Sequence, residues 1–303
     1  MLLDADPAAL CLVVLASFGT YPTRAWRYGS LLAPLDRVPF RRLVSATYLG
    51  YTAGLFVPRV GEVLRPWLVT RGRELPLGAA FAGMVLERLV DVMAILTLTG
   101  IGLLAGGGFG LDAPWGSRLE VASLAAGLAA LAVLALLMAL NARPRQTLRA
   151  LSACLRPLPD RAAAGIARSA ESFLSGLAVL RAPPVHLLLI AGQSLVVWLF
   201  GAAGFHAANR AFGLELPFHA ALVTLGFVVV GVTLPTPSGA GGFHAAYVLA
   251  LTAVYGAEPE RVAAAALACH GVTSLAVLAV GLAMLPGEGL RLRDLFRGPA
   301  AES

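Results

Sequence analysis

Charged residues are scarce in this chain, and lysine is missing from it altogether. Only 13% of the 303 residues are charged and 58% are hydrophobic, with a mean hydropathy of +0.79. A soluble domain is about a quarter charged, so the composition excludes an ordinary soluble protein. All 23 basic residues are arginine, which reflects a GC-rich genome more than a choice of phosphate ligands. The net charge of +6 lies in loops between apolar runs, and it does not predict a nucleic-acid partner.

Cysteines and catalytic motifs are equally sparse. Cys11, Cys154 and Cys269 are far apart and lack the spacing of a metal or redox site, so we expect packing roles, no metal and no cofactor. The sequence contains no GxSxG, HExxH or SxxK motif. These absences favour a protein that is not an enzyme, although they leave the question open.

Long apolar runs are what the sequence does have. About 20 apolar residues suffice for a helix to cross a bilayer. Five runs meet this length or approach it, at about 8–22, 77–105, 119–140, 185–207 and 262–286. We therefore predict an all-α polytopic membrane protein with about five full spans, forming a single transmembrane domain over residues 1–303.

Arginine placement predicts the orientation. The segments 23–42, 58–76, 142–183 and 287–303 hold 19 of the 23 arginines, and such segments face the cytoplasm. We expect a protein of the cell (cytoplasmic) membrane with its N-terminus outside and a cytoplasmic tail at 287–303. Within 142–183, apolar residues at helical spacing predict a cytoplasmic amphipathic connector on the surface. A regulatory or partner-binding helix is the alternative.

Three shorter apolar segments predict two re-entrant hairpins. Residues 43–57 are too short for a comfortable crossing and have basic loops at both ends, so the segment should enter and leave on the cytoplasmic side. Residues 218–234 and 243–256 meet at PTPSGAGG, and their outer ends are acidic. They should enter from the opposite face. Opposed hairpins suggest an inverted repeat, and broken helices at a repeat interface are typical of a transport site.

Charges inside a predicted span mark the first candidate site. Glu87, Arg88 and Asp91 lie in the run at 77–105 and sum to −1, so one carboxylate needs a partner. The stretch LFVPRVGEVLRPW offers Arg59 and Arg65. In the same stretch, Pro58 suits the first position of a helix, Gly61 allows close approach and Glu62 suits a first turn. The charges either pin the hairpin to the span or line a polar groove for an anionic headgroup.

The break PTPSGAGGF is the second candidate site. It holds Pro235, Pro237, Gly239 and Gly241, which cannot continue a helix. Free N–H groups at the start of the next helix could hold a phosphate. The alternative is a tight re-entrant turn. His244 follows directly, and we expect the other histidines to be packing or interfacial residues.

These motifs resemble those of the flippase-like membrane domain found in the lysylphosphatidylglycerol synthetase/flippase family. Its first signature is similar to P-x-R-x-G-E-x-x-R, and residues 58–65 match it except that Pro58 directly precedes Arg59. Its E-R-x-x-D signature is matched by 87–91, and its P-x-P-G-G-x-G signature is matched in part by 235–241. The resemblance covers nearly the whole chain. It implies re-entrant helices and movement of a phospholipid or related anionic lipid between leaflets.

The chain departs from the family pattern in three places. Ser238 stands where a glycine is usual, and His244 stands where a closing glutamate is expected. Members usually have one more N-terminal span, so we expect a shortened or late-started chain. Without a soluble aminoacyl-transfer domain, we do not expect this chain alone to synthesise lysylphosphatidylglycerol.

Three functional hypotheses follow. The favoured one is a flippase-like translocase of an anionic or aminoacylated phospholipid or related lipid. The alternatives are a membrane-embedded transferase acting on polyprenyl-phosphate-linked lipids, and a non-catalytic scaffold for a lipid-modifying enzyme. The expected partners are membrane phospholipid, a separate lipid-modifying enzyme and a second copy of the chain in a homodimer.

Overall fold

The fold is a bundle of helices, seen here in a computed structural model that describes residues 5–106, 116–234 and 236–297. All regular elements in these ranges are helical. The α-helices in chain order are α1 (Pro7–Leu32), α2 (Phe40–Phe56), α3 (Val60–Thr70), α4 (Leu77–Ala105), α5 (Gly116–Ala142), α6 (Pro144–Cys154), α7 (Asp160–Gly176), α8 (Pro184–Ala211), α9 (Phe218–Gly231), α10 (Gly242–Tyr255), α11 (Pro259–Met284) and α12 (Asp294–Arg297). Short 3-10 turns follow α7, precede α10 and follow α11, at Leu177–Arg181, Pro237–Gly239 and Pro286–Glu288.

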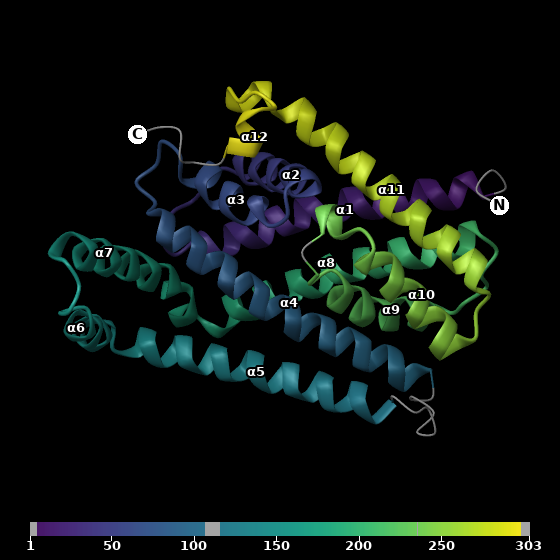
Figure 1. Ribbon diagram of the computed structural model, residues 1–303, viewed down its shortest axis with the longest axis horizontal. Helices are drawn as coiled ribbons and strands as arrows, with labels where there is room; N and C mark the ends of the chain where they lie inside the picture. The colour runs from purple at the N-terminus through teal and green to yellow at the C-terminus, as the bar shows by residue number, and fades with distance from the viewer. Residues whose placement is uncertain (1–4, 107–115, 235, 298–303) are drawn as a thin grey trace.

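Five of these helices are long and apolar enough to cross a membrane, which confirms the predicted number of spans. They are α1, α4, α5, α8 and α11. Buried apolar side chains form two clusters. One joins α1, α2, α3 and α4, and the other joins α8, α9, α10 and α11. Each short helix pair therefore packs into its own part of the core (Figure 1).

The first helix corrects the sequence prediction. We expected a span at 8–22 followed by a basic loop, but α1 continues through Pro22 to Leu32. Its last turns bury Tyr28 and Leu31 in the core, which gives the chain an apolar reason to stay helical. Arg24 and Arg27 thus lie inside a helix and not in the cytoplasmic loop that we assigned to them. Both side chains are buried.

Helices α2 and α3 cross at two glycines. A methyl group on Gly61 would lie 2.1 Å from the carbonyl oxygen of Gly50. The two backbones are therefore in direct contact, as the predicted close approach at Gly61 requires. Between the helices, Arg59 caps α3 in the left-handed region with φ 63°, so Pro58 precedes the cap and does not occupy the first helical position.

Replacing Gly61 with alanine should destabilise the protein by about 1–3 kcal/mol, because the added methyl collides with backbone that cannot rotate away. Gly54→Ala on α2 is the matched control. A methyl group there meets nothing within 4 Å, and alanine favours a helix over glycine by up to about 1 kcal/mol. Thermal unfolding in detergent should separate the two variants. Equal midpoints would contradict the tight crossing.

Helices α9 and α10 repeat this construction. A methyl group on Gly242 would lie 2.1 Å from the carbonyl oxygen of Gly231. These two glycines are as far apart in the sequence as Gly50 and Gly61. Within the described residues, the non-glycine positions with positive φ are Arg59 and Ser238 (59°), one in each break and each directly after a proline. The two helix pairs therefore share a local design.

The arginine-rich segment 142–183 forms two helices and not one solvated connector. Helix α6 buries no residue, in keeping with a surface helix. Helix α7 instead packs along α4, where Gly176 lies against Ala79, and Leu177 after it is fully buried. In Figure 1 these helices lie at the same end of the molecule as α2, α3 and α12, whereas α9, α10 and the start of α1 lie toward the other end.

The loops at this first end are tied together by an ion pair. The guanidinium of Arg73 donates to both carboxylate oxygens of Asp36, at 2.6 and 2.7 Å. This hydrogen bonding holds the pKa of the Asp36 carboxyl below its usual value. The C-terminal segment is also attached, because Leu295 of α12 is fully buried in the same core.

Candidate functional site

Six charged residues from three helices meet inside the bundle. They are Arg24 and Arg27 of α1, Arg65 of α3, and Glu87, Arg88 and Asp91 of α4. All except Arg88 are buried. A buried charge survives only if it is paired and hydrogen-bonded, so the contacts within this cluster decide what it can do.

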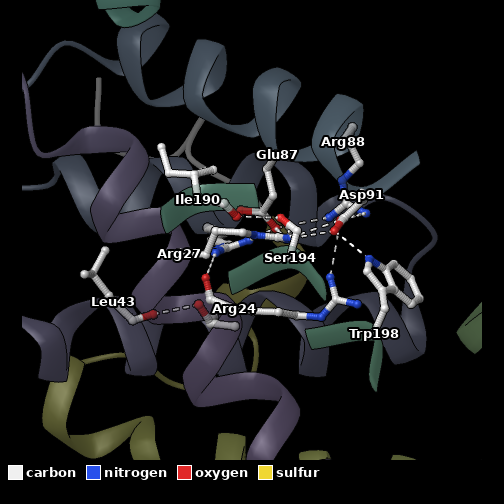
Figure 2. A network of polar contacts seen from close by, with 11 residues as sticks. Arg24, Arg27, Leu43, Glu87, Arg88, Asp91, Ile190, Ser194 and Trp198 are labelled. Atoms are coloured by element: carbon white, nitrogen blue, oxygen red, sulfur yellow. Dashed lines mark hydrogen bonds and ion pairs between the residues drawn. The ribbon is translucent and has the colours of Figure 1, made fainter. Parts of the chain in front are cut away.

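Arg27 lies at the centre of the cluster. Figure 2 shows its guanidinium beside both carboxylates of α4. One nitrogen donates to Asp91 at 2.5 Å and to the hydroxyl of Ser194 at 2.8 Å. The other lies 3.0 Å from Glu87. A single guanidinium thus bridges two carboxylates one helical turn apart, which is the geometry that its planar fork favours.

Arg65 pairs with the same oxygen of Glu87 as Arg27 does. Its guanidinium donates to Glu87 at 2.9 Å and to the backbone carbonyl of Arg24 at 3.3 Å. It also lies 4.2 Å above the ring of Tyr28, a cation–π contact. This confirms the predicted contact between the helix after the first break and the charges of α4.

Asp91 collects the remaining polar contacts. The indole N–H of Trp198 donates to its carboxylate at 2.7 Å, and Arg24 lies 3.6 Å from the other oxygen. Arg24 is also held over the Trp198 ring, 4.8 Å from the centroid. Helix α8 therefore supplies Trp198 and Ser194 to orient the charges of two other helices (Figure 2).

The charge balance of the cluster differs from the one expected. From the sequence we expected one unpaired carboxylate among Glu87, Arg88 and Asp91. Arg59 and Arg65 were expected to pair with it. With Arg24 and Arg27 present, four guanidinium groups face two carboxylates. The surplus is cationic, so a further ligand of this site should be an anion.

Arg88 is where the surplus charge becomes accessible. Its side chain is 49% exposed, and its guanidinium lies 3.6 Å from Glu87 and 3.9 Å from Asp91, too far for good hydrogen bonds. It lines a cavity of about 580 Å³. The walls of this cavity come from both helix breaks and from α4: Gly50, Tyr51, Gly54, Leu55, Pro58, Arg59, Gly61, Glu62, Arg65, Met84, Arg88, Val229, Val232, Thr233, Leu234, Thr236, Ser238 and Gly239.

The first break contributes charge to this cavity, but not as we predicted. Arg59 and Glu62 both line the cavity with exposed side chains. Among the ion pairs of the described residues, Arg65 contacts Glu87, whereas Arg59 contacts neither Glu87 nor Asp91. The physical reason is the left-handed backbone of Arg59, which turns it out of the face that α3 presents to α4. Within the described part of the chain Arg59 thus forms no ion pair, and it is a cation of the cavity wall and not part of the buried network.

The second break contributes hydroxyl groups. Ser238 and Gly239 line the cavity, while Pro237, Gly241 and His244 do not, and Pro235 lies outside the described residues. The Ser238 hydroxyl lies 2.8 Å from Nε2 of His270, whose ring stacks on His244 at 4.9 Å. The N–H of Gly241 donates to the His244 ring at 3.3 Å. This N–H of the predicted phosphate site at the start of α10 is therefore already in use.

Sequence reasoning missed four residues of the site. Arg24 and Arg27 looked like loop arginines after an early span end, although their three-residue spacing places them on one helix face. Ser194 and Trp198 are four residues apart in α8, and nothing in the sequence distinguished them from other helix residues. No group of three metal-ligating side chains was found in the described ranges.

A bundle of five apolar spans with an ion-paired cluster beside a cavity defines a multi-pass membrane protein with a polar site among its helices. Residues 1–281 match the family described as the lysylphosphatidylglycerol synthase TM region. The chain belongs to this family.

One curated relative is the protein named glycosyltransferase AglD from Haloferax volcanii. It is 27% identical over 328 aligned positions, which cover 96% of this chain and 52% of the relative. The chain thus spans about half the length of the relative that it matches.

Proposed function

We propose that the protein is a lipid translocase that binds the phosphate of an anionic membrane lipid in the cavity between the two helix breaks. The observation that carries this proposal is the cationic surplus at the cavity wall. Arg59 and Arg88 are exposed to the cavity, and Arg65 reaches it from the buried network. Arginine suits phosphate because its fork donates two parallel hydrogen bonds.

The two helix pairs would act as re-entrant hairpins that enter from opposite faces as an inverted repeat. The matched glycine crossings and the two left-handed residues after proline support this relation. Their positions toward opposite ends of the molecule support it too (Figure 1). Irregular backbone at membrane depth requires burial or a wet cavity, and both breaks border the same cavity.

The buried network would hold the path in place while the lipid moves. Arg27 and Arg65 keep Glu87 and Asp91 paired, so the carboxylates do not repel the lipid phosphate. Arg88 has only long contacts to those carboxylates and a hydrogen bond with the side chain of Tyr51, which a phosphate would have to replace. The headgroup would cross beside Arg88 while the tails remain in the bilayer.

The alternative is a membrane-embedded transferase. The name of the Haloferax volcanii relative favours it, as does the hydrogen bond between the Ser238 hydroxyl and His270 at the cavity edge. Turnover of a labelled sugar-linked polyprenyl phosphate by the purified protein would establish this alternative.

Reconstitution tests the translocase. The purified chain is placed in vesicles that carry labelled anionic, zwitterionic or polyprenyl-phosphate lipids, and a membrane-impermeant reductant measures how fast the inner label becomes accessible. Protein-dependent exposure of the anionic lipids is expected. If none of the lipids is exposed faster than in empty vesicles, the proposal is overturned.

A further inference from the structure

We infer that the cavity selects lipids whose phosphate carries an uncharged, hydroxyl-bearing headgroup, such as glycerol, inositol or a sugar, and that it disfavours aminoacylated and other cationic headgroups. This inference rests on the proposed lipid translocation and specifies its substrate. Two walls of the cavity carry it, one cationic and one lined with hydroxyl groups.

The cationic wall sets the charge of the ligand. Arg59, Arg65 and Arg88 border the cavity with a single carboxylate, that of Glu62. The buried residues behind them do not reverse this balance, because Arg24 and Arg27 match Glu87 and Asp91. A lysyl or other aminoacyl headgroup would bring an ammonium into this surplus of guanidinium groups, where like charges repel.

A second group of cavity residues offers hydrogen-bond acceptors. The Thr233 hydroxyl donates to the backbone carbonyl of Val230 in α9, and the Thr236 hydroxyl donates to that of Ala240, at 2.7 Å each. A hydroxyl oxygen that has used its proton in this way still has lone pairs to accept a hydrogen bond. Thr233 and Thr236 therefore suit a ligand that donates, as the hydroxyls of a polyol do. The Ser238 hydroxyl, 2.8 Å from Nε2 of His270, adds a third hydroxyl group to this wall.

The size of the cavity agrees with a headgroup larger than phosphate alone. Its volume of about 580 Å³ falls within the range of about 300–1,000 Å³ of pockets that enclose whole small molecules. A phosphate held between Arg59 and Arg88 would leave room toward the hydroxyl wall. The group attached to that phosphate would then contact Thr233 and Ser238.

Vesicles with tail-labelled lipids test this selectivity, because a label on the tail leaves each headgroup intact. Phosphatidylglycerol, phosphatidylinositol, phosphatidic acid, phosphatidylcholine and lysylphosphatidylglycerol are compared with the wild-type protein. We expect phosphatidylglycerol and phosphatidylinositol to be exposed at least about tenfold faster than lysylphosphatidylglycerol, a difference of about 1.4 kcal/mol. Phosphatidic acid, which has the charge but no headgroup hydroxyl, should fall between them.

Two substitutions test the hydroxyl wall. Thr233→Val keeps the shape of the side chain, and Ser238→Gly suits the left-handed backbone at φ 59°. The double variant should lose the preference for phosphatidylglycerol over phosphatidic acid, measured as the ratio of the two rates. Thr97→Val is the control, because that exposed hydroxyl bonds only within α4; it should change neither rate.

The outcomes separate the two proposals. If no lipid is exposed faster than in empty vesicles, the translocase itself fails. If all five lipids are exposed at one rate, or lysylphosphatidylglycerol is fastest, the translocase stands and the selectivity is overturned. Uptake of radiolabelled inorganic phosphate or glycerol phosphate into the same vesicles would assign the site to a soluble phosphate and overturn the lipid selectivity. The wild-type comparison decides the matter even if the double variant fails to fold.

Discussion

Replacing Arg27 with methionine is expected to lower the folding stability by about 3–5 kcal/mol. Arg27 is fully buried and bridges Glu87 and Asp91. Removing it leaves Asp91 with weaker partners and leaves Ser194 without its guanidinium contact. Glu87 keeps Arg65 at 2.9 Å, so the cost arises mainly at Asp91, a buried carboxylate whose nearest remaining cation is Arg24 at 3.6 Å.

Thermal unfolding of the detergent-solubilised protein, followed by size-exclusion chromatography, measures this loss. Arg37→Met is the matched control, because Arg37 is an exposed loop residue and its substitution should leave the midpoint unchanged. Removing the carboxylates together with the cation, in Arg27→Met with Glu87→Gln and Asp91→Asn, should recover part of the loss. If Arg27→Met unfolds at the same temperature as the Arg37→Met control, the bridge does not stabilise the bundle.

Replacing Arg88 with glutamine should have the opposite profile, slowing transport strongly while leaving the fold intact. Its side chain is 49% exposed and its ion contacts are long, so it adds less than about 1 kcal/mol to stability. A charge-assisted hydrogen bond to a phosphate is worth about 1.5–3 kcal/mol. The rate of lipid exposure should therefore fall about ten- to hundredfold.

The vesicle assay with a tail-labelled anionic lipid provides the measurement. Arg88→Lys keeps the charge without the fork and should retain intermediate activity. Arg261→Gln is the control, since that exposed arginine pairs with Glu258 at the start of α11 and lies outside the cavity wall. Wild-type exposure by a well-folded Arg88→Gln protein would remove Arg88 from the path.

Local sequence features predicted much of this architecture. The five spans follow from apolar length alone, and the crossing at Gly61 follows from a glycine beside a proline break. The contact of Arg65 with Glu87 could be predicted because a charge inside an apolar run requires a partner, and few candidates were near. In each case one physical requirement left a small number of solutions.

The missing parts of the site depend on contacts between distant segments. Arg24 and Arg27 were assigned to a loop because the rule that places arginines in the cytoplasm treats every arginine near a span end alike. Their carboxylate partners, which lie more than sixty residues away in the sequence, help to make a continued helix favourable. The same applies to Trp198, whose role depends on the position of Asp91 in another helix.

Arg59 shows a second reason why the site could not be predicted completely from the sequence. Its position in the chain places it near the charged cluster, but one left-handed backbone angle decides which way it faces. A single sequence does not encode that angle in any obvious way, because non-glycine residues rarely adopt it.

The long first helix has a consequence for how the protein is made. Helix α1 leaves the ribosome before α4, so two guanidinium groups reach the translocon before their carboxylates exist. On insertion scales each arginine at a helix centre opposes entry by about 2.5–3.5 kcal/mol, and α1 is the least apolar of the five candidate spans. We therefore expect α1 to reach its stable place in the bilayer only once Glu87 and Asp91 have been synthesised, so that α1 and α4 assemble cooperatively.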